Sequence, residues 1–449
     1  RTDAFLNKEF HKKQNFFSFS DIDSERKDRI MKFTSTEATP APHVPPGVLR
    51  LTGAAKEDIP MYRIQTMNKI SPVGLNRFPS ELYEVGDAVQ DPQGILVRSA
   101  KLLDLEFNPG LLAIARAGVG VNNIPLDRCA AAGIPVFSTP GANANAVKEL
   151  VICAMLMGSR DIPGAIRWVR EQAASGADVS TVVEKGKSAF IGPELYKKTL
   201  GIIGLGAIGS IVANTAISLG MDVYGYDPFL SVDTALRLDR HVHVVKDIND
   251  LYKRSNYITM HIHYTEKTAH MIDASAIAAM KRGVRVINLA RGEIVDDEAM
   301  LTALDTGMVA AYITDFPNNR LLTAPHVIAM PHLGASTPES EQNCAAMAVD
   351  TLRDYLESGN IRSSVNLPEM TMDRSGVQRL CVLHKNVPGM LANITSLFGR
   401  DGVNVENLSN KSRGDYAYTM VDLGSKVGDN VIEDVRRTAN VIRVRSLEW

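Results

Sequence analysis

Residues 199–209 read Thr-Leu-Gly-Ile-Ile-Gly-Leu-Gly-Ala-Ile-Gly, an apolar run that leads directly into a Gly-x-Gly-x-x-Gly motif. Such glycines permit a tight turn and a close backbone approach, and the N-terminus of the helix expected after them can face a pyrophosphate. Asp227 closes the next apolar run, 18 residues beyond Gly209. A carboxylate there can bind an adenine-ribose hydroxyl and would repel a 2′-phosphate, which favours NAD over NADP. The motif predicts an NAD site built from Gly204, Gly206, Ala207, Ile208, Gly209 and Asp227.

On both sides of this motif, short apolar runs alternate with stretches of helical periodicity. Before it, strands are expected at residues 94–97 and 111–115 and a long helix at 146–159. From the motif onward, we expect strands near residues 199–205, 222–227, 257–261, 284–289, 309–315 and 326–330, and one amphipathic helix over 338–358 that ends at Gly359. This order predicts an α/β chain with a doubly wound parallel sheet.

Two residues at strand ends are candidates for chemistry. Arg291 follows the apolar run at 284–287, and His332 follows the run at 327–330. In an open parallel sheet, the carboxyl ends of the strands share the edge at which ligands bind. An arginine offers a planar fork for a carboxylate, and a histidine can take a hydroxyl proton near neutral pH. Either residue alone is more often structural, but their joint placement beside an NAD site favours catalysis.

The glycine loop, the Asn-x-Ala-Arg-Gly block at 288–292 and the Pro-His-Leu-Gly-Ala-Ser-Thr segment at 331–337 resemble the D-isomer-specific 2-hydroxyacid dehydrogenases. The likeness covers about residues 61–367 and is strongest to members that act on 3-phospho-D-glycerate. It implies NAD-dependent oxidation of that substrate to 3-phosphooxypyruvate, the first step of L-serine biosynthesis, with His332 as the base and Arg291 holding the carboxylate. It also implies that the cofactor is bordered by Ala290, Asp315, His332 and Gly334.

The resemblance extends to the substrate site. It implies that Arg98 and Arg116 hold the phosphate, and that the backbone around residues 118–120 holds the carboxylate. A substrate with a phosphate and a carboxylate does require more than one arginine. The alternative is that both arginines only cap buried strands through backbone carbonyls. The expected substrate-binding residues are Arg98, Ser99, Arg116, Gly118, Val119, Gly120 and Asn143.

The family likeness also predicts the domain organisation. A flavodoxin-like substrate-binding domain would comprise residues 61–158 and 336–366, with a Rossmann NAD-binding domain at 159–335 inserted in it. Residues 1–60 are rich in proline and are expected to be a poorly ordered extension, or alternatively a docking arm.

The last segment, residues 376–449, reads strand, helix, strand, strand, helix, strand, which is the ferredoxin-like order. Its His-x-Asn-x-Pro-Gly turn resembles that of an ACT regulatory domain, which implies an L-serine effector near His384, Asn386 and Asn404 and allosteric control. A purely dimerising role is the alternative. As a separate module, it is expected to be removable without loss of hydride transfer.

One position departs from the family pattern. A glutamate that orients the histidine is expected in an Asp-x-Phe-x-x-Glu segment, but this chain carries Arg320 or Asn319 at that place, depending on the alignment. Either Asp315 or another acid substitutes, or activity is reduced. The missing glutamate supports one alternative function, a low-turnover NAD-binding sensor or scaffold. The other alternative is a hydroxypyruvate or glyoxylate reductase on the same fold.

Composition limits the remaining classes of function. The chain of 449 residues carries 49 Lys and Arg against 51 Asp and Glu, a net charge of -2. It therefore has no overall positive electrostatic field that would attract nucleic acid or an anionic membrane surface. No apolar run reaches the roughly 18 residues of a membrane helix. Four cysteines without a Cys-x-x-Cys pair predict neither a disulfide framework nor a metal site, so a cytoplasmic enzyme is expected, as a homodimer or homotetramer by resemblance. Because the sequence opens on Arg1, a missing leader stays open.

Overall fold

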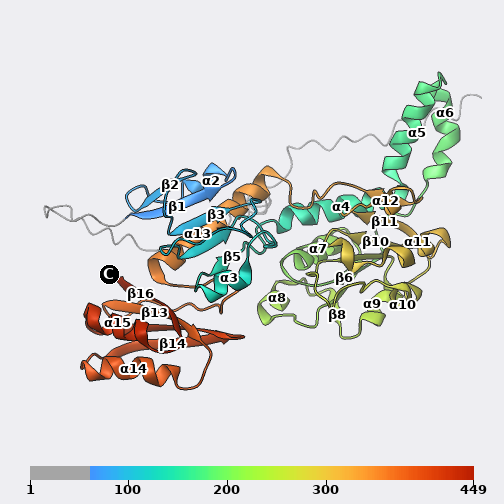
Figure 1. Ribbon diagram of the computed structural model, residues 1–449. Helices are drawn as coiled ribbons and strands as arrows, with labels where there is room; N and C mark the ends of the chain where they lie inside the picture. The colour runs from blue at the N-terminus through green and yellow to red at the C-terminus, as the bar shows by residue number, and fades with distance from the viewer. Residues whose placement is uncertain (1–60) are drawn as a thin grey trace, which may run out of the picture. The chain divides into compact units, whose positions relative to one another are not determined.

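The computed structural model describes residues 61–449, so the expectations for residues 1–60 lie outside the described part. Figure 1 shows two parallel sheets with helices around them and a third, antiparallel sheet at the C-terminal end. This arrangement confirms the predicted α/β class. Among the described residues, no helix is both long enough and apolar enough to cross a membrane.

The first sheet has five strands in the order β2-β1-β3-β4-β5, and all of its pairs are parallel. This is the flavodoxin-like order that was predicted. Its strands are β1 (Tyr62–Met67), β2 (Tyr83–Gly86), β3 (Gly94–Val97), β4 (Ala113–Arg116) and β5 (Val136–Phe137), and its short helices are α2 (Pro72–Leu75) and α3 (Leu126–Ala131). All four residues of β3 are buried, because helices cover both faces of a parallel sheet.

Helix α13 (Pro338–Ser358) completes the core of this first sheet, although it lies far along the chain. The side chain of Thr337 accepts from Ser340 N and caps the helix, and Gly359 ends it in the left-handed conformation with φ of 75°. The end of this helix at Gly359 was predicted from the sequence, whereas the capping role of Thr337 was not. Its buried face includes Leu352 and Tyr355, which join the same apolar cluster as Ile64 of β1.

The second sheet has seven parallel strands in the order β12-β11-β10-β9-β6-β7-β8, which is the doubly wound order with one strand added. Its strands are β6 (Thr199–Ile203), β7 (Asp222–Tyr226), β8 (Val242–Val245), β9 (Tyr257–Met260), β10 (Val284–Asn288), β11 (Val309–Thr314) and β12 (Val327–Ala329). Its helices are α7 (Ala207–Ser218), α8 (Val232–Arg237), α9 (Ile248–Arg254), α10 (Ala274–Ala278), α11 (Asp297–Asp305) and α12 (Asn319–Leu322). Strand β8 was not predicted, because it is a partly exposed edge strand without a buried apolar run.

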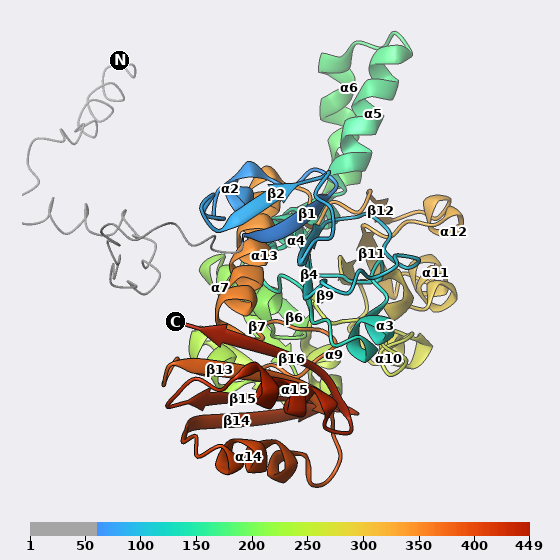
Figure 2. The same cartoon turned by 60° about the vertical axis from the view of Figure 1, so that its left-hand side comes forward.

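Helix α4 (Ala144–Arg160) packs against α7, β10 and β11 of the second sheet. It is followed by α5 (Ile162–Ala174) and α6 (Val179–Gly186), which Figure 2 shows as neighbouring helices of a hairpin. No residue of α5 or α6 is buried. Both helices are amphipathic, but this hairpin was not predicted.

The third sheet is antiparallel, in the order β14-β15-β13-β16. Its elements are β13 (Gln378–Lys385), α14 (Met390–Arg400), β14 (Val405–Arg413), β15 (Tyr416–Leu423), α15 (Asp429–Arg437) and β16 (Val441–Glu448), in the predicted order. One face packs against α14 and α15 through Leu380 and Val382. The other face, which includes Leu383, Tyr418 and Met420, belongs to the same apolar cluster as α13 and the first sheet.

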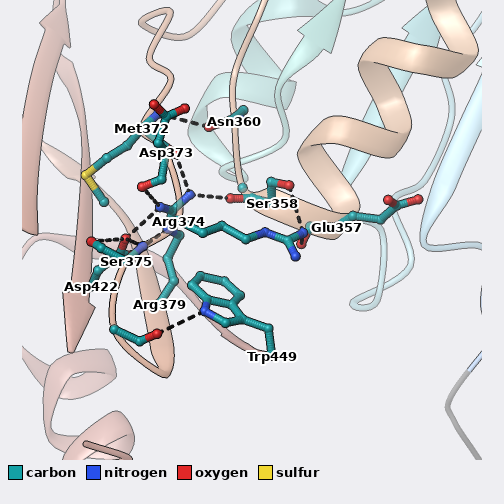
Figure 3. Close-up of polar contacts among 12 residues, drawn as sticks. Glu357, Ser358, Asn360, Met372, Asp373, Arg374, Ser375, Arg379, Asp422 and Trp449 are labelled. Atoms are coloured by element: carbon teal, nitrogen blue, oxygen red, sulfur yellow. Dashed lines mark hydrogen bonds and ion pairs between the residues drawn. The ribbon is translucent and has the colours of Figure 1, made fainter. Parts of the chain in front are cut away.

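A buried ion pair joins β13 and β15 of the third sheet, and its arginine also donates a hydrogen bond to the end of α13 (Figure 3). Arg379 is fully buried, and its Nε and Nη2 lie 2.6 and 2.7 Å from the two carboxylate oxygens of Asp422. Its other donors reach the carbonyl oxygens of Ser358, Met372 and Asp373. A buried pair is tolerated only when such hydrogen bonds satisfy both partners. The third sheet is therefore part of a shared core and not a loosely tethered module.

Candidate functional site

The glycine loop after β6 leaves space at one of its three glycines only. A Cβ atom added at Gly204 would lie 2.5 Å from the carbonyl oxygen of His261, and one at Gly209 would lie 1.9 Å from that of Gly204. A Cβ atom at Gly206, by contrast, would have no neighbour within 4 Å. Gly204 also has a φ of 90°, which only glycine adopts without strain. The loop is thus closely packed at Gly204 and Gly209, and it has free space at Gly206, where a pyrophosphate would lie.

Helix α7 begins directly after this opening. Gly206 is its N-cap and has no side chain to accept from the first N–H groups, which remain for a ligand. Asp227, after β7, is joined to the loop because its Oδ2 accepts from Leu205 N at 2.9 Å and its Oδ1 accepts from Phe229 N at 2.9 Å. The predicted NAD residues therefore lie together, and their donor groups fit a dinucleotide.

Arg291 lies at the end of β10, where the backbone is fixed by a neighbour that sequence reasoning missed. Asn288 is fully buried, donates to the carbonyl oxygen of Arg291 at 2.8 Å and accepts from Ala290 N at 3.2 Å. These bonds hold the turn that presents the guanidinium group. The signal for this role was an amide residue at the end of an apolar strand.

His332 is exposed in the loop between β12 and α13, and its ring lies 4.6 Å from the ring of Phe316. Nearby, Asp315 is almost completely buried, and its Oδ2 accepts from Gly334 N at 3.2 Å. Burial raises the pKa of the Asp315 carboxyl above its usual value, whereas the Gly334 N–H and the charge of His332 lower it. Asp315 is therefore a buried acid close enough to His332 for the histidine to affect the Asp315 pKa.

Arg320, which one alignment places at the position of the missing glutamate, has an acid of α11 as its partner. Arg320 is in α12, is mostly exposed, and has its Nη2 4.0 Å from Oε2 of Glu298 on α11. The neighbouring Asn318 caps the same short helix. These contacts place the charge of Arg320 beside that of Glu298.

Arg98 follows β3, Arg116 is the last residue of the adjacent strand β4, and Nε of Arg116 donates to the carbonyl oxygen of Arg98 at 2.9 Å. A Cβ atom at Gly120 would lie 3.3 Å from Nη2 of Arg291 and 3.7 Å from Nη1 of Arg116. Guanidinium groups from both parallel sheets thus border the loop at residues 118–120. Burial lowers the pKa of Arg116, Cys344 raises it, and the neighbouring Arg291 and Arg98 lower it again, as expected for clustered positive charges.

The remaining predicted substrate residues line the same region. Ser99 N donates to Oδ1 of Asn68, a residue that was not predicted. Asn143 is the N-cap residue of α4, and its Oδ1 is buried without a partner among the described residues. The unpredicted Thr139 donates its N–H to the carbonyl oxygen of Gly118 at 3.2 Å, and its buried hydroxyl also has no partner in this part of the chain. Such buried polar groups often mark places where a ligand or water completes the hydrogen bonds.

The predicted effector residues have partners of their own. His384 is 2% exposed, and its Nδ1 and Nε2 lie 2.8 Å from the carbonyl oxygen of Lys385 and from Oγ1 of Thr419. Asn386 donates to the carbonyl oxygen of Gly414, and Asn404 donates to Glu406. His384 is thus satisfied inside the sheet. Asn386 and Asn404 are exposed at opposite ends of it, because Asn386 N donates to the carbonyl oxygen of Asp415, just before β15, whereas Gly424 N, just after β15, donates to that of Asn404. Within one chain, the structure therefore does not bring these two predicted effector residues together.

Comparison with known proteins agrees with this geometry. Residues 152–334 match the family model "D-isomer specific 2-hydroxyacid dehydrogenase, NAD binding domain", which confirms the predicted NAD cofactor. A D-3-phosphoglycerate dehydrogenase of Synechocystis sp. is 36% identical over 326 residues, which cover 71% of this chain and 56% of that protein. The chain thus spans little more than half the length of that relative.

Two further matches each extend over most of the length of the matching protein. A D-3-phosphoglycerate dehydrogenase of Haemophilus influenzae is 31% identical over 379 residues, which cover 81% of this chain and 88% of that protein. The NAD-bound 3-phosphoglycerate dehydrogenase of Entamoeba histolytica has a TM-score of 0.54 at 26% identity, and the match covers 68% of this chain and 99% of that structure.

Proposed function

Because this chain belongs to the D-isomer-specific 2-hydroxyacid dehydrogenase family, we propose that it oxidises 3-phospho-D-glycerate to 3-phosphooxypyruvate with NAD, the first step of L-serine biosynthesis. One observation carries the choice of substrate. The guanidinium groups of Arg116 and Arg291 border a single point at Gly120, and Arg98 adjoins them. A small molecule with a carboxylate at one end and a phosphate at the other matches that charge.

Each residue has a role that follows from its place. His332, exposed at the strand edge, takes the proton of the C2 hydroxyl. Arg291 holds the substrate carboxylate and stabilises the charge that develops on the C2 oxygen. Asp315 stabilises the imidazolium that His332 becomes, because a nearby carboxylate favours the protonated ring. When bound, the nicotinamide ring supplies the hydride acceptor.

The arginines also separate this function from its alternatives. A hydroxypyruvate or glyoxylate reductase has no phosphate to bind, so Arg98 and Arg116 would have no substrate role. A sensor or scaffold needs neither His332 nor Arg291. The absent glutamate was the main support for that alternative, and Asp315 supplies an acid in the same neighbourhood.

A turnover assay tests the proposal. Formation of NADH is followed by absorbance with 3-phospho-D-glycerate and with D-glycerate, and its consumption is followed with hydroxypyruvate and glyoxylate. We expect kcat/KM to be highest for the phosphorylated substrate. A preference for hydroxypyruvate or glyoxylate would favour the reductase, and no turnover with any of them would favour the sensor.

We also propose the division into domains at residues 61–158 with 336–366, 159–335 and 376–449, and a homodimer or homotetramer. The last of these domains would bind L-serine at Asn386 and Asn404. Because these residues lie at opposite ends of the third sheet, one serine molecule would contact both only if two chains pair. Calorimetry with millimolar L-serine checks this point. If no heat of binding is seen with the intact chain, the domain is structural only.

A further inference from the structure

One of the arginines of the cluster is paired with an acid from α13. Nη2 of Arg98 lies 2.5 Å from Oε1 of Glu341, and both side chains are a little under half exposed, at 43% and 44%. The two residues are far apart in the sequence, and the pair joins the end of β3 to the first turn of α13. Glu341 was not among the residues predicted for the site.

The position of Glu341 is fixed by the helix that carries it. Thr337 caps α13, and an acidic side chain in the first turn is favoured by the partial positive charge of the helix N-terminus. One turn later, Cys344 is buried, and it raises the pKa of Arg116 against the lowering effect of burial. The same side of α13 therefore borders both Arg98 and Arg116.

The charges of the cluster are unequally compensated. Arg116 donates through Nε to the carbonyl oxygen of Arg98, and Arg291 donates to that of Ala290, so the partners found for these two are neutral. Arg98 alone has a carboxylate partner in the described structure. A phosphate that reaches Arg98 must therefore compete with Glu341 and come close to its negative charge.

We propose that Glu341 determines how tightly the site holds the phosphate end of its substrate, as an internal competitor for Arg98. The inference rests on the proposed function, because it concerns the same substrate. A substrate whose far end is neutral does not compete for Arg98 and is not repelled by Glu341. The effect of Glu341 thus increases with the charge at the far end and does not reach the hydroxyl group that is oxidised.

The test is Glu341→Gln, which keeps the size of the side chain and removes its charge. An exposed ion pair of this kind corresponds to about a two- to fivefold change in binding. We expect KM for 3-phospho-D-glycerate to fall by that factor while kcat, and KM for D-glycerate, stay the same. Glu341→Asp keeps the charge and is expected to restore most of the parent KM.

Glu339→Gln is the matched control, because Glu339 is an exposed acid in the same turn of α13. It removes an equal charge and should leave KM unchanged. In an Arg98→Gln background, Glu341→Gln should also have no effect, because the competition needs the guanidinium group.

Two results overturn the inference. One is a KM for 3-phospho-D-glycerate that falls no more in Glu341→Gln than in Glu339→Gln. The other is an equal change in the Arg98→Gln background. Failure of the proposed function is a separate outcome, since it appears in the parent chain as a kcat/KM for 3-phospho-D-glycerate no higher than that for D-glycerate.

Discussion

Asp422→Asn tests whether the third sheet and α13 form one cooperative core. The substitution keeps the shape of the side chain but leaves the guanidinium group of Arg379, which is fully buried, without its counter-charge. It weakens two hydrogen bonds of 2.6 and 2.7 Å, and the bonds that Asp422 accepts from Ser375 N and Oγ. Breaking a buried pair by neutralising one partner costs about 3–5 kcal/mol of unfolding free energy.

The assay is urea unfolding followed by the fluorescence of Trp449, with every chain carrying Trp168→Phe because the sequence has a second tryptophan there. Its indole Nε1 donates to the carbonyl oxygen of Gly376, and its ring centroid lies 5.3 Å from the guanidinium carbon of Arg379, so it reports on this junction (Figure 3). Glu433→Gln is the control, because it removes an acid from exposed pairs with Arg436 and Arg437 in the same module. We expect the control to lower the unfolding free energy by less than about 1 kcal/mol. If the two variants unfold at the same urea concentration, the pair does not hold the junction.

Two further predictions follow from buried groups. Deletion of residues 376–449 should lower the unfolding free energy of the remaining chain by several kcal/mol, since it uncovers Tyr355 and Leu356; a fragment as stable as the full chain, measured by urea unfolding, would contradict the shared core. Asp315→Asn should raise Tm at pH 7, because a raised carboxyl pKa means that ionised Asp315 costs stability there. That gain in Tm should disappear as pH falls below the usual Asp pKa of 3.8, where the carboxyl is protonated in both the folded and the unfolded chain. If the difference in Tm between the variant and the parent does not change with pH, the pKa of Asp315 is not raised in the folded chain.

Much of the fold could be predicted because its signals are local. The end of α13 was predicted from Gly359, which has the capping role there. Strand β3 was predicted because its sequence is a short apolar run, and in the structure all four of its residues are buried. Strand β8 was missed because an edge strand has no such run.

The site was predictable in its parts but not in its pairings. The resemblance assigned Arg98, Arg116 and Arg291 to the same substrate. The structure brings the guanidinium groups of Arg116 and Arg291 to Gly120, and Arg116 contacts the backbone of Arg98. The partnership of Glu341 with Arg98 joins residues 243 positions apart, so no local pattern indicates it. The fully buried Arg379 could not be predicted either, because an arginine in a strand usually indicates an exposed face.

The expectation of a separable C-terminal module also depended on local signals. The ferredoxin-like order was correct, but it does not tell which face of the sheet is covered. Arg445 donates to the carbonyl oxygens of Tyr355 and Leu356 at the end of α13, and Tyr418 donates to that of Gly359. These contacts lie between segments distant in the sequence, so only the folded chain shows that the module shares its core with the first sheet.

The central claim is that Arg98 and Arg116 bind a phosphate at the far end of the substrate. Its most direct test is the ratio of kcat/KM for 3-phospho-D-glycerate to that for D-glycerate, in the parent chain, in Arg98→Ala and Arg116→Ala, and in Lys101→Ala as a control for a nearby exposed charge. Loss of a charge-assisted hydrogen bond costs about 1.5–3 kcal/mol, so each arginine variant should lower the ratio roughly ten- to hundredfold, and the control should not. If each arginine variant lowers kcat/KM equally for both substrates, so that the ratio is unchanged, Arg98 and Arg116 do not bind the phosphate.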